Sequence, residues 1–450
     1  MRRQIRRSRL GEAGTASGSD LAIGAVESGW TNPPPVRLAD GTLIRLFKDG
    51  QALRAAFEAI RAAKRVVCLE VYIFHSDATG RAFADLLSAK AREGVRVFVL
   101  YDSFGSIATD PVIFRSMRAA GVLVREFNPM RPWDCRYSWR PLNRDHRKLL
   151  IIDHDIAGLG GLNVGLEYGS GFLTNLKSKS EVWRDNAIGV MGPSARALFH
   201  CFAKSWHYVA RGGPISRAEC IHNLDVGRRI RHPRMRRQKL KERASGILIY
   251  PGGEGQDNVR TLPTQPVPPT ITLGVLASAP TMSSPLLPFM QKLVRDARRS
   301  VHMTIAYFAP SDPFIDELCK AARRGVDVRL MLPGRSDVRL LHAAARSFYE
   351  TLLAAGVEIF ERQGAVLHAK TLVIDGEITV IGSANLDYRS IEYNCEISAV
   401  VRSAELGRQM LDLFDHDVQY AEQISLGEWR HRPAWDRAVQ WAVSRARYVL

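Results

Sequence analysis

Two stretches of the chain, HRKLLIID at residues 146–153 and HAKTLVID at residues 368–375, share one pattern of histidine, lysine and aspartate. A glycine-rich turn and an asparagine follow each stretch, in GLGGLNVG (158–165) and IGSANLDYRS (381–390). Side chains two positions apart on a strand point to the same face, so each histidine is predicted to share a face with its lysine. The apolar run before each aspartate predicts a strand that is buried on both sides.

The surroundings of the two motifs repeat as well. Before the first motif stand RVVCLEVYIF (65–74), AREGVRVFVLYD (91–102) and AAGVLVREF (119–127), and before the second stand RSVHMTIAYF (299–308), AARRGVDVRLMLP (321–333) and AAGVEIFE (354–361). Each series predicts strands that alternate with helices. The fold class is therefore predicted to be α/β, with two α/β sandwich lobes related by internal duplication and an active site at their interface.

Changes in composition place the boundaries of these lobes. The predicted order is a flexible basic tail (1–36), lobe one (37–212), a basic linker rich in proline and glycine (213–275), lobe two (276–428) and an amphipathic C-terminal helix (429–450). On that last helix Trp435, Val439 and Val443 share a face, which suits either the surface of a membrane or the protein's own core.

The composition is that of a globular protein that can bury a core, with 450 residues of which 46% are hydrophobic. No stretch is predicted to span a membrane, and the N-terminus lacks the apolar segment of a secretory signal. The six cysteines form no CxxC pair, which favours a reduced, cytoplasmic protein.

The net charge of +17 is concentrated in two places. Arginines within residues 2–9 and the run RRIRHPRMRRQKLKER (228–243) together carry a net +13. Such segments attract anionic phospholipids or nucleic acid, and a solvated basic linker has the same composition.

The paired motifs suit chemistry on a phosphodiester. A neutral imidazole can attack phosphorus while a second imidazole protonates the leaving alcohol, and lysines and amide donors stabilise the charge that develops on the phosphate oxygens. The predicted catalytic residues are His146, Lys148, Asp153 and Asn163 from the first motif and His368, Lys370, Asp375 and Asn385 from the second.

Each histidine also needs a partner that fixes its tautomer. The acids downstream of the motifs are Asp185, which follows His146, and Glu396, which follows His368, and each is expected to orient the histidine before it. The other histidines and the cysteines show no metal-binding spacing, so neither a metal nor another cofactor is expected.

The motifs and their flanks resemble the phospholipase D superfamily, and most of all bacterial cardiolipin synthases of the subgroup without N-terminal transmembrane helices. DHRKLLIID (145–153), WRDNAIGVMGP (183–193), LHAKTLVIDGE (367–377) and GSANLDYRSIEYNCE (382–396) carry this resemblance. It implies transfer of a phosphatidyl group from phosphatidylglycerol to a histidine and then to the hydroxyl of a second phospholipid. By analogy His146 is the nucleophile and His368 the acid, although the reverse order stays open.

We expect a cytoplasmic enzyme that is peripheral on the inner membrane, with anionic phospholipids and the membrane surface as partners. Nucleic acid is a less favoured partner, and no obligate protein partner is inferred. Three alternatives remain at this stage. The enzyme can be a phospholipase D that uses water, a phosphodiesterase acting on nucleic acid, or a membrane-surface adaptor with an inactive site. Two complete motifs in one chain favour the lipid enzyme.

Overall fold

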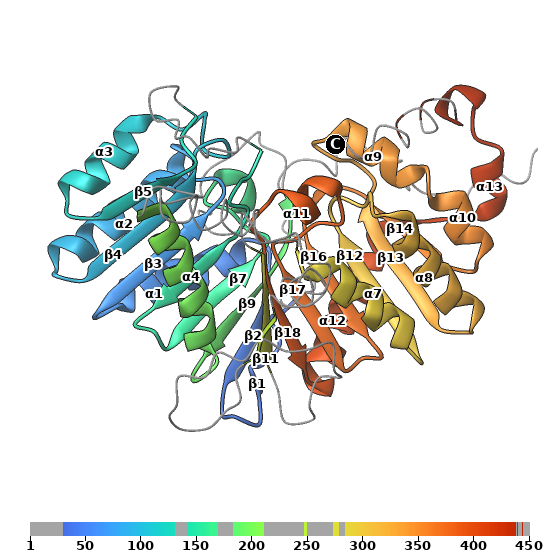
Figure 1. Ribbon diagram of the computed structural model, residues 1–450, viewed down its shortest axis with the longest axis horizontal. Helices are drawn as coiled ribbons and strands as arrows, with labels where there is room; N and C mark the ends of the chain where they lie inside the picture. Colours follow the sequence, from blue (N-terminus) through green and yellow to red (C-terminus); the bar gives the residue numbers. More distant parts are fainter. Residues whose placement is uncertain are drawn as a thin grey trace, which may run out of the picture.

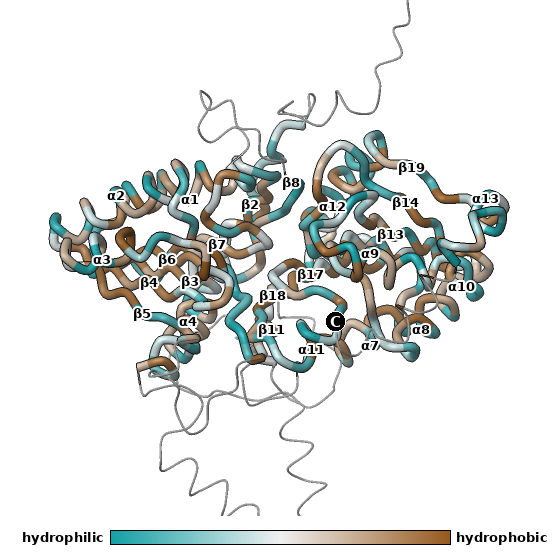
Figure 2. Tube along the Cα trace, turned by 90° about the horizontal axis from the view of Figure 1, so that it is seen from above, coloured by the Kyte–Doolittle hydropathy of each residue, from teal (hydrophilic) through white to brown (hydrophobic). Residues whose placement is uncertain are grey.

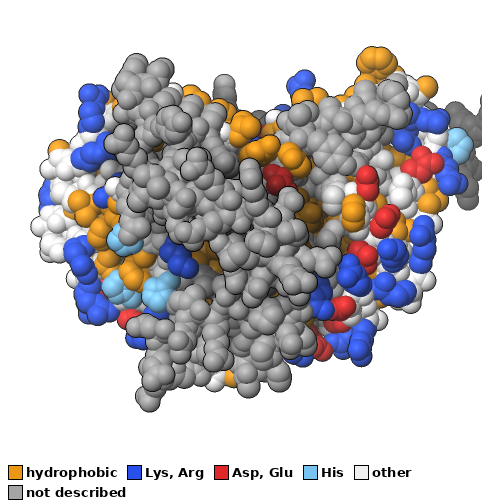
Figure 3. Space-filling model, viewed as in Figure 1, with side chains coloured by type: hydrophobic (Ala, Val, Ile, Leu, Met, Phe, Trp, Pro, Cys, Tyr) orange, Lys and Arg blue, Asp and Glu red, His pale blue; other side chains and the backbone are white. Residues whose placement is uncertain are grey.

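Two α/β lobes lie side by side in the protein (Figure 1). The structure is a computed structural model that describes residues 30–130, 142–169, 183–210, 247–249, 273–278 and 284–437, together with residues 439 and 443. Residues 2–9 and the basic run at 228–243 lie outside the described residues, and so does most of the predicted linker. On the face drawn in Figure 3, lysines and arginines are spread over the flanks of both lobes.

Lobe one is built around an eight-stranded sheet. Its elements are β1 (Val36–Arg37), β2 (Leu43–Lys48), α1 (Gly50–Ala62), β3 (Val66–Val71), α2 (Ala78–Arg92), β4 (Arg96–Asp102), α3 (Pro111–Ala119), β5 (Leu123–Phe127), β6 (Leu149–Ile152), β7 (Ile156–Gly160), η3 (Leu166–Tyr168), β8 (Trp183–Arg184), β9 (Asn186–Met191) and α4 (Ala195–Ala210).

Lobe two is built around a nine-stranded sheet. Its elements are β10 (Ile247–Ile249), β11 (Leu273–Ala277), α7 (Leu286–Asp296), β12 (Ser300–Ile305), α8 (Asp312–Arg323), β13 (Asp327–Pro333), α9 (Arg339–Arg346), α10 (Tyr349–Ala354), β14 (Glu358–Arg362), β15 (Val366–Leu367), β16 (Lys370–Ile374), β17 (Ile378–Gly382), α11 (Tyr388–Glu392), β18 (Ile397–Arg402), α12 (Ala404–Val418), β19 (Ala421–Ile424) and α13 (Leu426–Arg430).

The two sheets have the same topology over seven strands. The order β2-β9-β7-β6-β3-β4-β5 in lobe one corresponds to β11-β18-β17-β16-β12-β13-β14 in lobe two. In each lobe the first strand of the repeat, β3 or β12, pairs in parallel with the next strand and antiparallel with the motif strand, β6 or β16. The predicted duplication and the predicted α/β class are therefore confirmed.

The sequence explains these elements through burial and capping. Every residue of β3, β6 and β16 is buried, as expected for strands covered on both faces. Figure 2 shows hydrophobic residues gathered on the strands of both lobes. The side chain of Asp77 accepts the backbone N–H of Gly80 at the start of α2, and Asp110 caps α3 ahead of Pro111.

The lobes share one hydrophobic core. Helices α1, α2 and α3 cover one face of the lobe-one sheet, whereas the other face contributes to a cluster that also contains strands of lobe two. In this cluster Ile188 and Val190 of β9 join Ile397, Ala399 and Val401 of β18. The two lobes are thus held together by buried apolar surface, and their relative position is fixed by packing.

Backbone pairing and a buried ion pair cross the same interface. Strand β15 of lobe two pairs in parallel with β8 of lobe one. Arg184 of β8 is almost fully buried, and its guanidinium donates two hydrogen bonds to the carboxylate of Asp417 in α12, at 2.8 and 2.7 Å.

The predicted C-terminal helix is described only in part. Trp435 is 75% exposed, whereas Val443 packs against a small cluster formed by Ala309, Leu341 and Ala344 of lobe two. Among the described residues, no helix is both long and apolar enough to cross a bilayer.

Arg184→Ala is expected to lower the free energy of unfolding by about 3–5 kcal/mol, because it leaves the buried Asp417 without its strongest partner. The matched control is Arg61→Ala, which removes an exposed ion pair with Glu58 and costs about 0–1 kcal/mol. Urea unfolding of both variants measures the difference. Equal losses would show that the interface does not depend on this ion pair.

Candidate active site

The two motif histidines face one cavity of about 310 Å³ at the junction of the lobes. His146 stands three residues before the start of β6, and His368 stands two residues before the start of β16, so the duplicated strands bring both imidazoles to the same place. Asn163 and Asn385 line the same cavity. The structure therefore brings together the histidines and asparagines that were predicted from the sequence.

Each imidazole is held by a carboxylate from the other lobe. The Nδ1 atom of His146 lies 3.0 Å from a carboxylate oxygen of Glu396, and the Nδ1 atom of His368 lies 2.8 Å from a carboxylate oxygen of Asp185. The prediction that these two acids orient the histidines is consistent with this geometry, but the expected pairing within each lobe is wrong.

Backbone hydrogen bonds across the interface explain why each histidine contacts the acid of the other lobe. The N–H of His146 donates to the carbonyl of Cys395, the residue before Glu396, at 3.0 Å. The N–H of His368 donates to the carbonyl of Arg184, the residue before Asp185, at 2.8 Å. Each histidine segment thus runs beside the acid segment of the opposite lobe, which places each acid next to the other lobe's imidazole.

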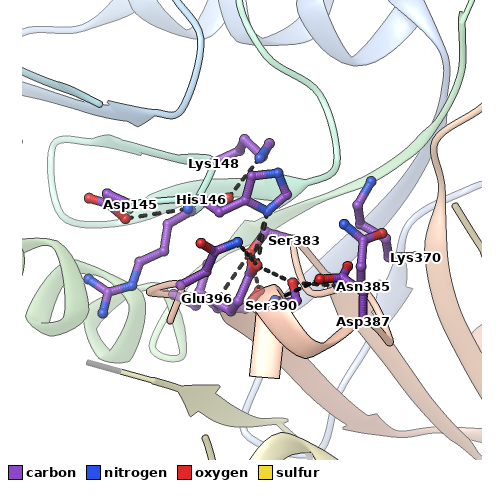
Figure 4. A network of polar contacts seen from close by, with 12 residues as sticks. Asp145, His146, Lys148, Lys370, Ser383, Asn385, Asp387, Ser390 and Glu396 are labelled. Carbon is purple, nitrogen blue, oxygen red and sulfur yellow. Dashed lines mark hydrogen bonds and ion pairs between the residues drawn. The ribbon is translucent and has the colours of Figure 1, made fainter. Parts of the chain in front are cut away.

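The two carboxylates differ in their surroundings. The hydroxyls of Ser383 and Ser390 both donate to Glu396, which Figure 4 shows between these serines and His146. Asp185 instead accepts the backbone N–H of Asn186 at 2.7 Å. Gly161 lies beside it, and a Cβ atom there would come within 2.2 Å of the Asp185 carboxylate. Glu396 therefore has more hydroxyl donors than Asp185.

Burial sets the protonation of the histidines. It lowers the pKa of His146 to about 4, against the opposing effect of Glu396. Burial, followed by the charges of Lys370 and Lys148, also holds the pKa of His368 well below its ordinary value. Both imidazoles are neutral near pH 7, with an Nδ1–H group that can donate to the carboxylate and a free lone pair on Nε2.

The acids respond to burial in opposite directions. Burial raises the pKa of Asp185 to about 7, despite the nearby Lys370. Burial also acts to raise the pKa of Glu396, but the contacts with His146, Lys148 and Ser383 outweigh it and the pKa is lowered. Glu396 is therefore the carboxylate that stays ionised.

Both motif lysines are buried beside the histidines. The ammonium of Lys148 donates to the carbonyl of His146 at 2.7 Å, and Lys370 donates to the carbonyl of His368. Burial lowers the pKa of Lys148 to about 7 and that of Lys370 to about 8. An anion in the site would offset this desolvation and favour both ammonium forms.

The side chains of the two asparagines differ in how far they are already hydrogen-bonded within the protein. Asn163 accepts the backbone N–H of Ile73 at 3.1 Å and donates to the hydroxyl of Tyr168 at 2.8 Å. The side-chain oxygen of Asn385 is buried, and within the described residues it has no hydrogen-bond partner. Asn385 is thus the more available of the two for a ligand.

The structure does not bring Asp153 and Asp375 to the cavity, so the predicted catalytic role for these two residues is wrong. The carboxylate of Asp153 accepts the backbone N–H groups of Lys64, Arg65 and Val66. Asp375 does the same for Arg298, Arg299 and Ser300. Both residues stand at the far end of the motif strand, about 20 Å along extended chain from the histidine, where they anchor β3 and β12.

Two aromatic residues beside the histidines, Tyr72 and Trp183, were not among the site residues predicted from the sequence. The ring of Tyr72 lies 4.9 Å from that of His146, and the ring of Trp183 lies 4.8 Å from that of His368. Tyr307 lines the cavity and donates to Asp337, whereas Phe308 belongs to the core of lobe two. The aromatic residues that follow β3 and β12 in the sequence were the available signal.

Nothing in the described part of the chain forms a group of three His, Cys, Asp or Glu residues that could hold a metal ion. Lys148 and Lys370 supply positive charge beside the histidines, and Arg389 also lines their cavity.

The chain is similar to cardiolipin synthases over most of its length. A family model for the cardiolipin synthase, PLD-like domain matches residues 290–418. Cardiolipin synthase A of Pseudomonas putida (strain W619) is 32% identical over 386 residues, which cover 85% of this chain and 70% of the relative. The cardiolipin synthase of Geobacillus thermodenitrificans (strain NG80-2) is 31% identical over 415 residues, or 91% of this chain and 72% of the relative. The chain belongs to the cardiolipin synthase family of phospholipase D-like proteins.

Solved structures confirm the fold. Phosphatidylserine synthase of Haemophilus influenzae Rd KW20 matches 92% of this chain and 97% of its own, with a TM-score of 0.64 and 14% identity. Polyphosphate kinase from Porphyromonas gingivalis matches 90% of this chain and 52% of its own, with a TM-score of 0.52 and 13% identity. At such low identity these matches establish the fold alone.

The protonation of the histidines can be measured by NMR on protein with ¹⁵N-labelled imidazoles. At pH 6 both His146 and His368 are expected to be neutral with hydrogen on Nδ1, because their pKa values are lowered and the neutral form persists above them. Glu396→Gln should change the signal of His146, and the control Glu392→Gln, at the exposed last residue of α11, should change neither signal. A response of His368 rather than His146 to Glu396→Gln would contradict the exchanged pairing.

Proposed function

We propose that this protein is a phosphatidyltransferase that makes cardiolipin from two molecules of phosphatidylglycerol through a phosphohistidine intermediate, without a metal. One observation carries the proposal. Two neutral histidines in one cavity are each oriented by a carboxylate, next to two buried lysines. The relatives at about 31% identity are cardiolipin synthases, which supports phosphatidylglycerol as the substrate.

The first step transfers the phosphatidyl group to the enzyme. Lys148 and Lys370 hold the phosphate of phosphatidylglycerol, and Nε2 of His146 attacks phosphorus. The P–N bond forms as the bond to the glycerol oxygen breaks, and His368 gives its Nε2 proton to that oxygen. The negative phosphate raises the pKa of His368 in the complex, so this histidine can carry the proton that it lacks in the empty site.

The second step returns the enzyme to its starting state. The glycerol headgroup of a second phosphatidylglycerol brings a hydroxyl to the phosphohistidine. His368, now neutral, removes the proton of this hydroxyl as its oxygen attacks phosphorus, and the P–N bond breaks. The products are cardiolipin and glycerol, which balance the two substrate molecules.

The different surroundings of the carboxylates favour His146 as the nucleophile. A histidine that attacks phosphorus becomes positively charged, and an ionised partner stabilises that charge. Glu396 is the ionised partner, since its pKa is lowered, whereas Asp185 has a pKa raised to about 7. We assign Asp185 to hold His368 as the acid and base.

Transfer in place of hydrolysis requires that the intermediate meets a lipid hydroxyl before water. The rings of Tyr72, Trp183 and Tyr307 supply an apolar wall around the histidines. We place the enzyme at the cytoplasmic surface of the inner membrane, where anionic lipids attract the basic run at 228–243. The C-terminal segment around the exposed Trp435 is the proposed second contact with the membrane.

His146→Ala and His368→Ala are each expected to lower turnover by about 10³-fold or more, because nucleophile and acid act as a unit. Labelled phosphatidylglycerol vesicles and product analysis by mass measure the reaction, and wild-type protein should form cardiolipin and glycerol with or without EDTA. More than about a tenth of the wild-type rate in either variant, a barrier change of only about 1.4 kcal/mol, would exclude the two-histidine mechanism. Phosphatidic acid as the main early product would make the protein a hydrolase.

The pH dependence of kcat/KM is expected to follow the lysines on its alkaline side. Lys148 and Lys370 lose their protons as pH rises through about 7 and 8, and the neutral amines bind phosphate less well. The decline should therefore begin between pH 7 and 8 in the free enzyme. Lys148→Arg should move this limb to higher pH, because arginine stays protonated. If the alkaline limb of the pH profile does not move in either Lys148→Arg or Lys370→Arg, then that limb reports the titration of another group.

A further inference from the structure

A second cavity of about 310 Å³ lies in lobe one, between α1 and the face of the sheet formed by β2, β9, β7 and β6. Its walls are almost entirely apolar. Small residues leave the space open, and they are Ala52, Ala55, Ala56 and Ala59 on α1 and Gly158, Gly160, Ala187 and Gly189 on the strands. An apolar cavity of this size can hold an organic ligand.

Lobe two offers an internal comparison for α1. Ala63 follows α1 and Ala297 follows α7 with nearly the same backbone angles, φ −58° and ψ 138° against φ −58° and ψ 137°. This correspondence places large residues of α7 where α1 has alanines. Leu286, Phe289, Met290 and Leu293 stand opposite Ala52, Ala55, Ala56 and Ala59, respectively.

The strands show the same difference. Gly158 of β7 pairs with Gly189 of β9, and at the corresponding place in lobe two Val380 of β17 pairs with Val400 of β18. Both valines belong to the buried core of lobe two, together with Leu286, Met290 and Leu293. The same architecture is therefore filled in lobe two, and the open space in lobe one is not a requirement of the fold.

The cavity reaches the catalytic centre. Asn163 lines both this cavity and the one that holds the histidines. Lys148 also lines the apolar cavity, while its ammonium lies 2.7 Å from the carbonyl oxygen of His146. A molecule with an anionic group at the lysines and a long apolar tail would match this change from polar to apolar walls.

We propose that the lobe-one cavity binds one fatty acyl chain of the phospholipid whose phosphate is held at the histidines. This assignment rests on the proposed function and extends it to substrate recognition. Unfilled apolar space costs stability, since its lining atoms lack partners. An acyl chain supplies those partners and positions the phosphodiester through the apolar end of the substrate.

The binding test uses phosphatidylglycerol with a photoreactive group at the end of one acyl chain. In wild-type protein the crosslinks should map to peptides containing α1, β7 or β9. Ala56→Met/Ala59→Leu, which copies lobe two, should lose these crosslinks, and so should Gly158→Val, whose added Cβ would lie an ordinary 3.8 Å from the Cβ of Leu150. The matched control Glu58→Met, on the exposed side of α1, should keep them.

The kinetic test compares long-chain with dihexanoyl phosphatidylglycerol. The two cavity-filling variants, Ala56→Met/Ala59→Leu and Gly158→Val, are called the filled variants. They should lose about tenfold in kcat/KM on the long-chain lipid, because they displace methylene groups from an apolar site. They should change by less than about twofold on the short-chain lipid, whose few methylenes do not need the full cavity. Their melting temperatures should stay at or above that of the wild type, since the cavity is filled.

The outcomes separate this inference from the proposed function. Crosslinks elsewhere, or crosslinks that persist in the filled variants, would overturn the acyl-chain site even if cardiolipin is made. Equal losses on both lipids would also overturn it. Crosslinks in lobe one of a protein that forms no cardiolipin would keep the acyl-chain site and reject the proposed product.

Discussion

The exchange of carboxylates between the lobes is the interaction on which the rest of the site depends. Glu396 of lobe two holds His146 of lobe one, and Asp185 of lobe one holds His368 of lobe two. A single lobe therefore contains a histidine without its orienting acid. The buried core shared by both sheets and the Arg184–Asp417 pair fix the lobes in the one arrangement that completes both pairs. The packing that holds the two lobes together therefore also completes both histidine–carboxylate pairs.

Duplication gives symmetry, and the differences between the copies give the two halves their separate tasks. Ser383 in lobe two corresponds to Gly161 in lobe one, so Glu396 gains a hydroxyl donor at the position where Asp185 lies beside a residue without a side chain. This difference favours an ionised Glu396 and hence a nucleophilic His146. In the same way, alanines and glycines of lobe one replace larger residues of lobe two and open a cavity next to the one that holds the histidines.

The sequence predicted the features that depend on local pattern. The alternation of strands and helices, the duplication and the convergence of both histidines followed from repeated motifs with buried strands. The prediction that each acid orients the histidine of its own lobe was wrong, because sequence order cannot show that the segments before His146 and His368 cross to the opposite lobe. The predicted roles of Asp153 and Asp375 were wrong because a motif does not show that its histidine and its aspartate lie at opposite ends of an extended strand. The cavity required knowledge of which alanines of α1 face the sheet.

The most direct test of the account asks which histidine receives the phosphatidyl group. A phosphatidyl ester of p-nitrophenol has a leaving group that needs no acid, so His368→Ala should still react once with it. Peptide mass spectrometry of this variant should find the phosphatidyl group on His146. An adduct on another residue, or none, would contradict a site in which the first lobe attacks and the second lobe protonates.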